Sequence, residues 1–454
     1  MTNNISSITT KQLIDNFGLY HPIEISNKLK QIYKSDKEIF FDTLHKIPDD
    51  LLGDVLLELP EILRDKAYSS LSNQQITNAL EELETDDATD IIQDLEDLDK
   101  KKATEILNSL DQEDRDDINW LKKYDENEAG AYMQIELFSA NIDETIQNSL
   151  DRLKKLKNEH ELENIHQVFI IDDETILIAT ISLEDLIIYD FSKTYKQILN
   201  DEPKKYNTKY KPYSIQGDAN ISEVVNQFDD YNLSVMAVTG YKNRLLGRIT
   251  SDDILEIAEQ NATEQMYQLA GVNDESEQEE NLAQTGKKRA TWLVINLFTA
   301  IMASLVIGFY QDTLREFIAL AILMPIVASM GGNAGTQTLA VMVRQIALGD
   351  IDDTNSKDAI KKEIFISIFN GILFALILAV ISFLWFKSYM LSVVIALSII
   401  ITLFCAGFFG AIIPLVLKRL NIDPAIGSTV ILTTVTDMMG FFSFLALAKM
   451  LLVK

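Results

Sequence analysis

The stretch AIGSTVILTTVTDMMGFFSFLALAK, from Ala425 to Lys449, decides the fold. It is apolar for about 24 residues, and roughly 20 residues of helix span the hydrocarbon of a bilayer, so it predicts a transmembrane helix. One ionisable side chain, Asp437, lies well inside it, at a cost of at least ~2.5 kcal/mol unless it faces water or protein. Steps of three to four residues place Thr429, Thr433 and Asp437 on one stripe. We interpret this stripe as the wall of a cation path; the alternative is a neutral Asp that hydrogen-bonds neighbouring helices.

The charge divides the chain in two. The 454 residues include 40 Lys+Arg and 68 Asp+Glu; from Lys287 onward we count 13 and 9, which leaves 27 and 59 before it, a net charge of −32. An acidic half therefore precedes an apolar half. Such a surface disfavours nucleic acid as a partner and suits cations, although solubility alone also explains acidic surfaces. The single cysteine, Cys405, lies in an apolar stretch, so we expect no disulfide framework and no thiolate metal site.

Four other apolar stretches precede the stretch from Ala425 to Lys449 in the sequence. We expect five spans, at about 290–310, 317–343, 363–386, 390–417 and 425–448, with Asp437 as the one acidic residue inside a span. Basic residues collect at cytosolic span ends. Nine of them fall on the side of the acidic half and four on the other, so we expect a multi-pass protein of the cell membrane, with the acidic half cytosolic and the C-terminus outside.

The second span is polar and rich in glycine between Ser329 and Thr338, and Pro325 precedes this run. Proline interrupts helical hydrogen bonding, and irregular backbone in a membrane is tolerated only where it is buried in protein or lines water. We therefore expect a broken helix that lines a polar path; the alternative is close packing of helices through small residues. The predicted lining comes from two spans and consists of Gly331, Gly332, Asn333, Thr336, Gln337, Thr429 and Thr433.

The first part of the acidic half is expected to be helical. Residues 1 to about 130 carry apolar stripes that recur every 12–15 residues, which is typical of a helical solenoid. Asp86, Asp87 and Asp90 cluster at one helix start. Acids there favour the helix N-terminus, so capping is about as good an explanation as metal binding.

A repeat follows the helical part. Val168 to Ile187 and Val235 to Leu255 each read as strand, turn, strand and helix start. Each follows a predicted amphipathic helix, Asp143 to Leu156 and Ile221 to Tyr231 respectively. The repeat resembles a pair of cystathionine-β-synthase (CBS) domains. In that family a Gly-x-x-Thr-x-x-Asp element often contacts the ribose of an adenine nucleotide, and here it corresponds to Gly247, Thr250 and Asp253.

A long acidic helix is expected after the repeat, from Ser251 to Asp274, with Asp253, Glu256 and Glu264 at helical spacings. It leads to the first span, as a connection between a soluble sensor and a membrane domain would. A solvated connecting helix with no further role is the alternative.

The residues around Asp437 suit a hydrated divalent cation. Mg²⁺ keeps several waters and takes few carboxylates, and one Asp among hydroxyls and carbonyls matches that preference. No histidine follows His166, so soft metals have no ligands in the spans. The chemistry alone leaves Mg²⁺, Mn²⁺ and Ca²⁺ open.

The chain resembles the MgtE family of magnesium transporters over nearly its whole length. The resemblance rests on Pro325, Gly331-Gly332-Asn333, Gly335, Gln337, Asn370-Gly371, Asp423-Pro424-Ala425 and the segment from Thr434 to Gly440. It implies a mixed fold: a helical N domain over 1–130, tandem CBS domains over 131–258, a connecting helix and linker over 259–288, and a five-span pore domain over 289–454.

The resemblance also implies a function. Members form homodimers with the pore between the subunits, and the acid that recognises the hydrated ion corresponds to Asp437. Mg²⁺ is both the transported and the regulatory ion, and ATP is a further candidate ligand of the CBS pair. The regulatory ions that close the pore would be bound by Asp86, Asp87, Asp90, Asp253, Glu256 and Glu264.

Two other classes remain open at this point. A proton-coupled carrier of Mn²⁺, Co²⁺ or Ca²⁺ would use Asp437 as a titrating group. A CBS-type nucleotide receptor with a membrane anchor would need no polar path. We expect no enzyme, since the chain has no P-loop and no convincing pair of nucleophile and base.

Overall fold

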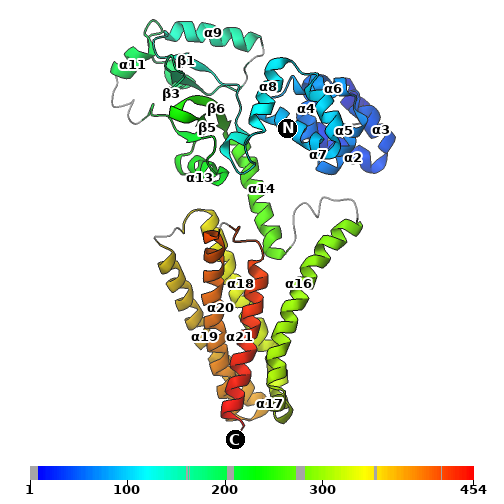
Figure 1. Cartoon of the computed structure of the whole chain (residues 1–454), viewed down its shortest axis with the longest axis vertical. Helices are drawn as coiled ribbons and strands as arrows, with labels where there is room; N and C mark the ends of the chain where they lie inside the picture. Colours follow the sequence, from blue (N-terminus) through cyan, green and yellow to red (C-terminus); the bar gives the residue numbers. More distant parts are fainter. Residues whose placement is uncertain are drawn as a thin grey trace. The chain divides into compact units, whose positions relative to one another are not determined.

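The computed structural model describes residues 9–159, 162, 164–201, 209–271, 282–351, 355–420 and 422–453 (Figure 1). The chain separates into two compact units, Met1–Glu259 and Gln260–Lys454. This division lies one residue from the expected boundary between the CBS pair and the connecting helix; the finer domain limits remain predictions.

The first unit begins with eight short helices that share one apolar core. Four of them are capped at the start by side-chain oxygens, as Ser72 caps α6 and Asp111 caps α8. The longest is bent at Asp99, whose backbone is not helical. The helices are α1 (Thr10–Asp15), α2 (Pro22–Ser35), α3 (Lys37–Leu44), α4 (Asp49–Leu57), α5 (Glu61–Ser70), α6 (Asn73–Leu80), α7 (Thr85–Leu107) and α8 (Gln112–Leu121), with a 3-10 turn, η2 (Phe17–Leu19).

The expected repeat is confirmed as two three-stranded sheets with the same topology. In each sheet the middle strand pairs in parallel with the first and antiparallel with the third, and the register shifts at the same place, after Ile170 and after Val238. The first sheet consists of β1 (Ser139–Asn141), β2 (Gln167–Ile171) and β3 (Leu177–Ser182), and the second of β4 (Ser214–Gln216), β5 (Val235–Thr239) and β6 (Leu245–Thr250).

Helices complete each half of the repeat. The amphipathic helix expected over Ile221–Tyr231 is α13, with those bounds, and the one expected over residues 143–156 is α9 (Ile146–Asn158), which begins and ends slightly later. The short remaining elements are η3 (Ala129–Tyr132), α10 (Leu183–Leu186), α11 (Tyr195–Asp201) and η4 (Tyr241–Asn243). The expected acidic helix is α14 (Ser251–Ala270); the rest of its predicted range, beyond residue 271, lies outside the described residues.

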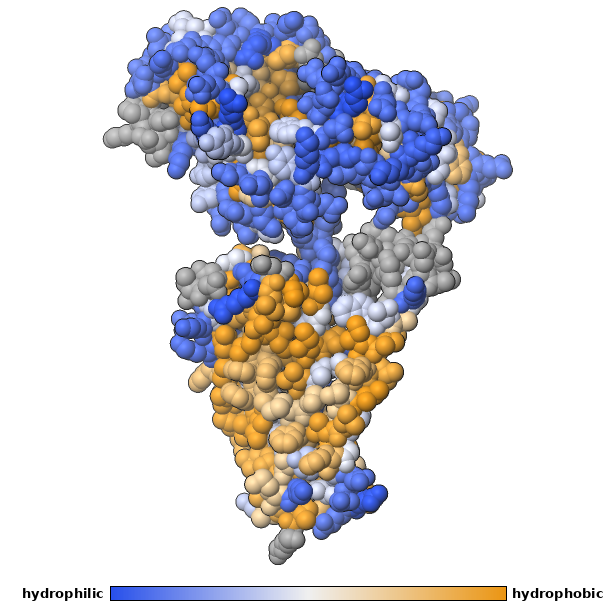
Figure 2. Space-filling model, viewed as in Figure 1, coloured by the Kyte–Doolittle hydropathy of each residue, from blue (hydrophilic) through white to orange (hydrophobic). Residues whose placement is uncertain are grey.

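The second unit contains five helices long and apolar enough to cross a membrane, as predicted. They are α16 (Leu282–Phe309), α18 (Ile318–Ala347), α19 (Ser356–Phe386), α20 (Tyr389–Arg419) and α21 (Ser428–Leu451), with the short α17 (Gln311–Glu316) between the first two. Helix α20 packs on α18, α19 and α21, and α16 packs on α21. Figure 2 shows a broad apolar surface over these helices, which is stable only against lipid or protein.

Two expectations for the spans are wrong. Helix α18 runs without a break through Pro325 and the glycines. Glycine weakens a helix by about 1 kcal/mol, whereas each unsatisfied backbone group in hydrocarbon costs several kcal/mol, so the helical hydrogen bonds prevail. Asp437 is also not the one acidic residue inside a span, because α19 contains Glu363, which is buried.

Candidate functional site: ion path and carboxylate cluster

Asp437 lies in the third turn of α21, half-buried. The helix starts after Gly427, whose positive φ of 68° turns the chain, and the preceding Asp423 accepts a hydrogen bond from the Ala425 N–H at 2.7 Å. Within the residues that the structure describes, no basic side chain forms an ion pair with Asp437. Its negative charge is therefore available to a cation.

Hydroxyl groups surround Asp437 on the same helix. Thr433 donates to the Thr429 carbonyl at 2.6 Å and Thr436 to the Thr433 carbonyl at 3.1 Å. Thr436 is fully buried. Thr433 is exposed, and because its hydroxyl donates its hydrogen to the backbone, its oxygen lone pairs remain free to accept from water. Such an oxygen suits the water shell of an ion.

Helix α18 supplies the second polar surface. Asn333, Thr336 and Gln337 are exposed on it, and Thr433 is exposed on α21. The two helices pack together, and a Cβ on Gly331 would lie 3.7 Å from the Thr436 Cβ, so the buried sides of α18 and α21 contact each other one residue from Asp437. Exposed amides and hydroxyls within a span require water or protein beside them.

The two adjacent glycines of α18 have different surroundings. A Cβ on Gly331 would lie 2.7 Å from the Thr402 Cγ2 of α20, whereas a Cβ on Gly332 would meet nothing within 4 Å. Gly331 therefore allows close packing of helices, and Gly332 lies on the open side together with the polar residues. Both remain predicted lining residues.

Thr429 lies in the first turn of α21, at the N-terminal end of the stripe that also contains Thr433 and Asp437. Its Oγ1 donates to the Leu269 carbonyl at 2.9 Å, and Leu269 packs against buried residues that include Leu339, Ala425 and Leu432. The last turn of α14 thus sits against the helices that carry the polar surfaces. This contact joins residues 160 positions apart and has no sequence signal.

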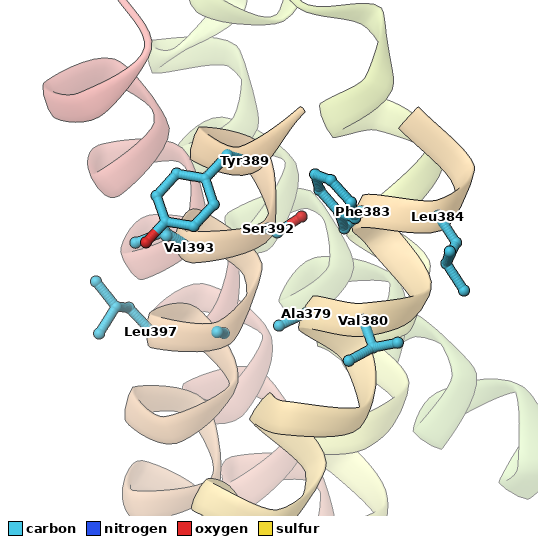
Figure 3. Close-up of a pocket in the computed structure, with 9 residues that line it drawn as sticks. Ala379, Val380, Phe383, Leu384, Tyr389, Ser392, Val393 and Leu397 are labelled. Atoms are coloured by element: carbon cyan, nitrogen blue, oxygen red, sulfur yellow. The ribbon is translucent and has the colours of Figure 1, made fainter. Parts of the chain in front are cut away.

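An apolar groove of about 370 Å³ lies elsewhere in this unit, between α19 and α20 (Figure 3). No charged side chain lines it, so it does not offer ligands to a cation. Its lining consists of Ala379, Val380, Phe383, Leu384, Tyr389, Ser392, Val393, Ala396 and Leu397.

In the first unit the fold gathers acids that are far apart in the sequence. Asp86 and Asp87 in the first turn of α7 lie near enough to Asp253 of α14 for charge repulsion. Burial, then the charge of Asp87, raises the pKa of Asp86, which is 7% exposed. Burial, then the charges of Asp90 and Asp253, raises the pKa of Asp87 to about 8. We call Asp86, Asp87, Asp90 and Asp253 the carboxylate cluster.

Glu84 and Arg248 hold α7 against the second sheet, and no sequence motif singles out either residue. Arg248 is 2% exposed; its Nη2 donates to Glu84 Oε1 at 3.3 Å and its Nη1 to the Asn164 carbonyl at 2.9 Å. Burial raises the pKa of Glu84 to about 7 despite the nearby guanidinium of Arg248. Both residues of this ion pair are close in sequence to the carboxylate cluster: Glu84 lies just before Asp86, and Arg248 lies just before Asp253.

The other two predicted regulatory ligands, Glu256 and Glu264, are exposed and are not part of the carboxylate cluster. Glu256 is exposed, and its charge contributes to the raised pKa of Asp253 after burial and Asp252. Glu264 belongs to the second unit, is exposed and accepts from Gln268 Nε2 at 2.6 Å. Among the described residues, no three acidic, histidine or cysteine side chains converge closely enough to hold a metal ion.

The predicted nucleotide element lies at the end of β6. Thr250 donates to Asp253 Oδ2 from its Oγ1 at 2.7 Å and from its N–H at 3.3 Å. A Cβ on Gly247 would lie 2.7 Å from the Gln134 carbonyl, so this position requires glycine for close backbone approach. Asp253 is thus shared between this element and the carboxylate cluster.

Three family models match the chain. A divalent cation transporter model covers residues 324–447, an MgtE intracellular N domain model covers 20–127, and a CBS domain model covers 205–259. Together with the five spans, they define a multi-pass membrane transporter of divalent cations with an intracellular N-terminal domain, and not an enzyme.

Relatives identify the family. The chain is 30% identical to the magnesium transporter MgtE of Enterococcus faecalis over 339 residues, which is 74% of this chain and 72% of that protein. It is 28% identical to the magnesium transporter MgtE of Thermus thermophilus over 340 residues, 74% of this chain and 73% of that one. The chain belongs to the MgtE family.

Solved structures match the cytosolic part. One is the cytosolic domain of the Mg²⁺ channel MgtE in complex with ATP, with 23% identity, a TM-score of 0.44 and coverage of 56% of this chain and 92% of that chain. Another is the soluble part of a magnesium transporter, with 22% identity, a TM-score of 0.47 and coverage of 57% and 95%.

Proposed function

We propose that this protein is a Mg²⁺-selective channel that cytosolic Mg²⁺ closes. The observation that carries the proposal is Asp437, which has no ion-pair partner among the described residues and lies on α21, a helix that packs on α18 with its exposed Asn333, Thr336 and Gln337. A carboxylate in a span costs several kcal/mol, and the charge of a passing cation offsets that cost. Hydroxyls and amides around one carboxylate suit an ion that keeps its waters, which is the habit of Mg²⁺.

We propose further that the path lies between two copies of the chain. Asn333, Thr336, Gln337 and Thr433 are exposed on a single copy, and lipid cannot satisfy their hydrogen bonds. A second copy related by twofold symmetry would bring the same surfaces together around water and place two Asp437 carboxylates at the narrow point.

Regulation is proposed to act through the carboxylate cluster. With no cation bound, its charges repel one another by about 1–4 kcal/mol per close pair. Mg²⁺ between them would favour the arrangement in which they are close, and the population of that state follows from differential affinity for the two states. The contact between Thr429 and Leu269 offers a route from α14 to the path.

The CBS pair is proposed to bind an adenine nucleotide at Gly247, Thr250 and Asp253. The support is the cytosolic domain of an MgtE channel in complex with ATP, together with the tight approach of Gly247 to the Gln134 backbone. Because Asp253 also belongs to the carboxylate cluster, nucleotide and Mg²⁺ would affect each other's binding.

Ion flux into liposomes tests the function. Purified full-length protein is reconstituted, and influx of Mg²⁺, Mn²⁺, Co²⁺ and Ca²⁺ is compared at a fixed voltage. We expect Mg²⁺ influx that continues when the pH gradient is collapsed. Influx that stops with the pH gradient would indicate the proton-coupled carrier instead, and no flux of any divalent ion would leave only the membrane-anchored receptor.

A further inference from the structure

Glu363 is a second carboxylate among the spanning helices, in addition to Asp437. It lies at the start of the third turn of α19, is 8% exposed and accepts a hydrogen bond at 3.2 Å from the Oγ1 of Thr338 on α18, which is 5% exposed. Within the described residues no basic side chain pairs with it; the nearby Lys361 pairs with Asp358 and Lys418 donates to the Ile351 carbonyl. A buried carboxylate with one neutral partner requires a reason other than charge pairing.

Two glycines of α20 make this contact possible. A Cβ on Gly410 would lie 3.0 Å from the Thr338 Cβ, and a Cβ on Gly407 would lie 3.3 Å from the Glu363 carbonyl oxygen. Helix α20 thus has no side chain where α18 and α19 approach each other across it. Since α18 otherwise packs mainly on α20 and α21, the hydrogen bond between Thr338 and Glu363 is a direct link from α18 to α19.

Thr338 lies behind the polar surface of α18. At 100° per residue, it is roughly 150° around the helix from the centre of the stripe formed by Asn333, Thr336 and Gln337. It also lies about 10 Å along the helix from Gly331, which is level with Asp437. Glu363 therefore contacts α18, through Thr338, on the side of that helix that faces away from the proposed ion path.

We propose that Glu363 is a positioning residue that fixes the rotation of α18 about its own axis and so aims Asn333, Thr336 and Gln337 at the ion path. This inference rests on the proposed function. Between Val327 and Thr338 the buried residues of α18 are Gly331 and Gly335, which present few ridges that would resist rotation; the larger buried side chains lie nearer the helix ends. A directional hydrogen bond does resist it. A 20° rotation moves a side-chain atom about 5 Å from the axis by roughly 2 Å, enough to spoil a ligand position.

The first arm of the test measures Mg²⁺ influx by the full-length protein in liposomes. Thr338→Val removes only the hydroxyl, and Glu363→Leu removes the acceptor. We expect each to lower influx about tenfold, the double variant to be no worse than either, and Glu363→Gln, which keeps an acceptor, to retain most of the flux. Ser382→Ala is the control, because this buried hydroxyl of α19 has no hydrogen-bond partner in the described part of the chain.

The second arm measures the rotation itself. In a Cys405→Ala background, Thr336→Cys on the polar surface and Leu339→Cys on the buried side report which face of α18 reacts with a charged thiol reagent. We expect Thr336→Cys to react far faster than Leu339→Cys, and that ratio to fall severalfold once Thr338→Val is added. An unreactive Thr336→Cys without Thr338→Val would count against the polar path itself, and hence against the proposed function.

Any of three results would overturn the inference while leaving the proposed function intact. The first is additive losses in the double variant, and the second is unchanged labelling with Thr338→Val. The third is a loss in Glu363→Gln as large as in Glu363→Leu, which would show that the charge of Glu363, and not its hydrogen bond, is needed. Gel filtration and thermal unfolding report whether each variant folds; if Glu363→Leu does not, the nearly isosteric Thr338→Val decides by itself.

Discussion

Replacing Asp87 with Asn should stabilise the first unit in the absence of Mg²⁺ and weaken its response to Mg²⁺. Burial and the charges of Asp90 and Asp253 raise the pKa of Asp87 to about 8, roughly four units above its ordinary value of 3.8. At 1.36 kcal/mol per unit, this shift lowers the stability of the folded unit by about 4 kcal/mol at pH 7, mainly because the folded unit must protonate a group that is ionised in the unfolded chain. Asn keeps the shape and loses the charge, at the cost of ~0.3–1 kcal/mol of favourable interaction with the N-terminus of α7. A net gain of about 3 kcal/mol remains.

The pH dependence has a definite sign. Because the folded pKa is above the unfolded one, the folded unit binds more protons, so its Mg²⁺-free stability falls as pH rises between about 4 and 8. We expect hydrogen exchange of α7 in the full-length protein, corrected for intrinsic rates, to show this slope between pH 6 and 8 in the parent and a flatter one in Asp87→Asn. Mg²⁺ should protect α7 strongly in the parent and weakly in the variant.

The matched control is Glu38→Gln, an exposed acid in the first turn of α3 that lies outside the carboxylate cluster. It should change protection by no more than about 0.5 kcal/mol. The reasoning is refuted if Asp87→Asn lowers Mg²⁺-free protection of α7, or if Mg²⁺ protects parent and variant equally.

Three further results are expected. Gly332→Leu should block influx in liposomes while Gly332→Ala conducts, since the side chain would enter the open side of α18; normal flux through the leucine variant would remove Gly332 from the lining. Gly331→Ala should destabilise the second unit by ~1–3 kcal/mol in thermal unfolding, because its Cβ would lie 2.7 Å from a side chain of α20. Neutralising Asp253, Glu256 and Glu264 together should keep the channel open at Mg²⁺ levels that close the parent; superimposable curves of open probability would show these acids to be a solvated face.

Composition and periodicity were sufficient for the architecture. Hydrophobic length alone located the five spans, and the strand–turn–strand repeat located both sheets, with α13 at its predicted bounds. These features depend on neighbours in the sequence. The acids at the start of α7 were also visible as a group, although their partner Asp253 was linked to them only through the family resemblance.

Contacts between segments that are distant in the chain cannot be predicted from local sequence patterns. Arg248 finds Glu84 across 164 positions and Thr429 finds Leu269 across 160, and neither pair has a local pattern. The broken helix expected at Pro325 is wrong because the polar path is expected to satisfy free backbone groups, whereas in the structure α18 keeps its own helical hydrogen bonds through the proline and the glycines. Glu363 was overlooked because it stands at the edge of an apolar run, and its burial follows from packing against α18 and α20.

The most direct test of the central claim is Mg²⁺ influx through Asp437→Ala, beside the parent and the control Asp312→Asn, whose carboxylate is exposed on α17. Removing a charge worth about 2.5–3.5 kcal/mol to an ion in the span predicts a fall in influx of roughly 100-fold, in a protein that still folds and elutes like the parent. Asp312→Asn should conduct normally. Parental Mg²⁺ influx through well-folded Asp437→Ala would contradict the account.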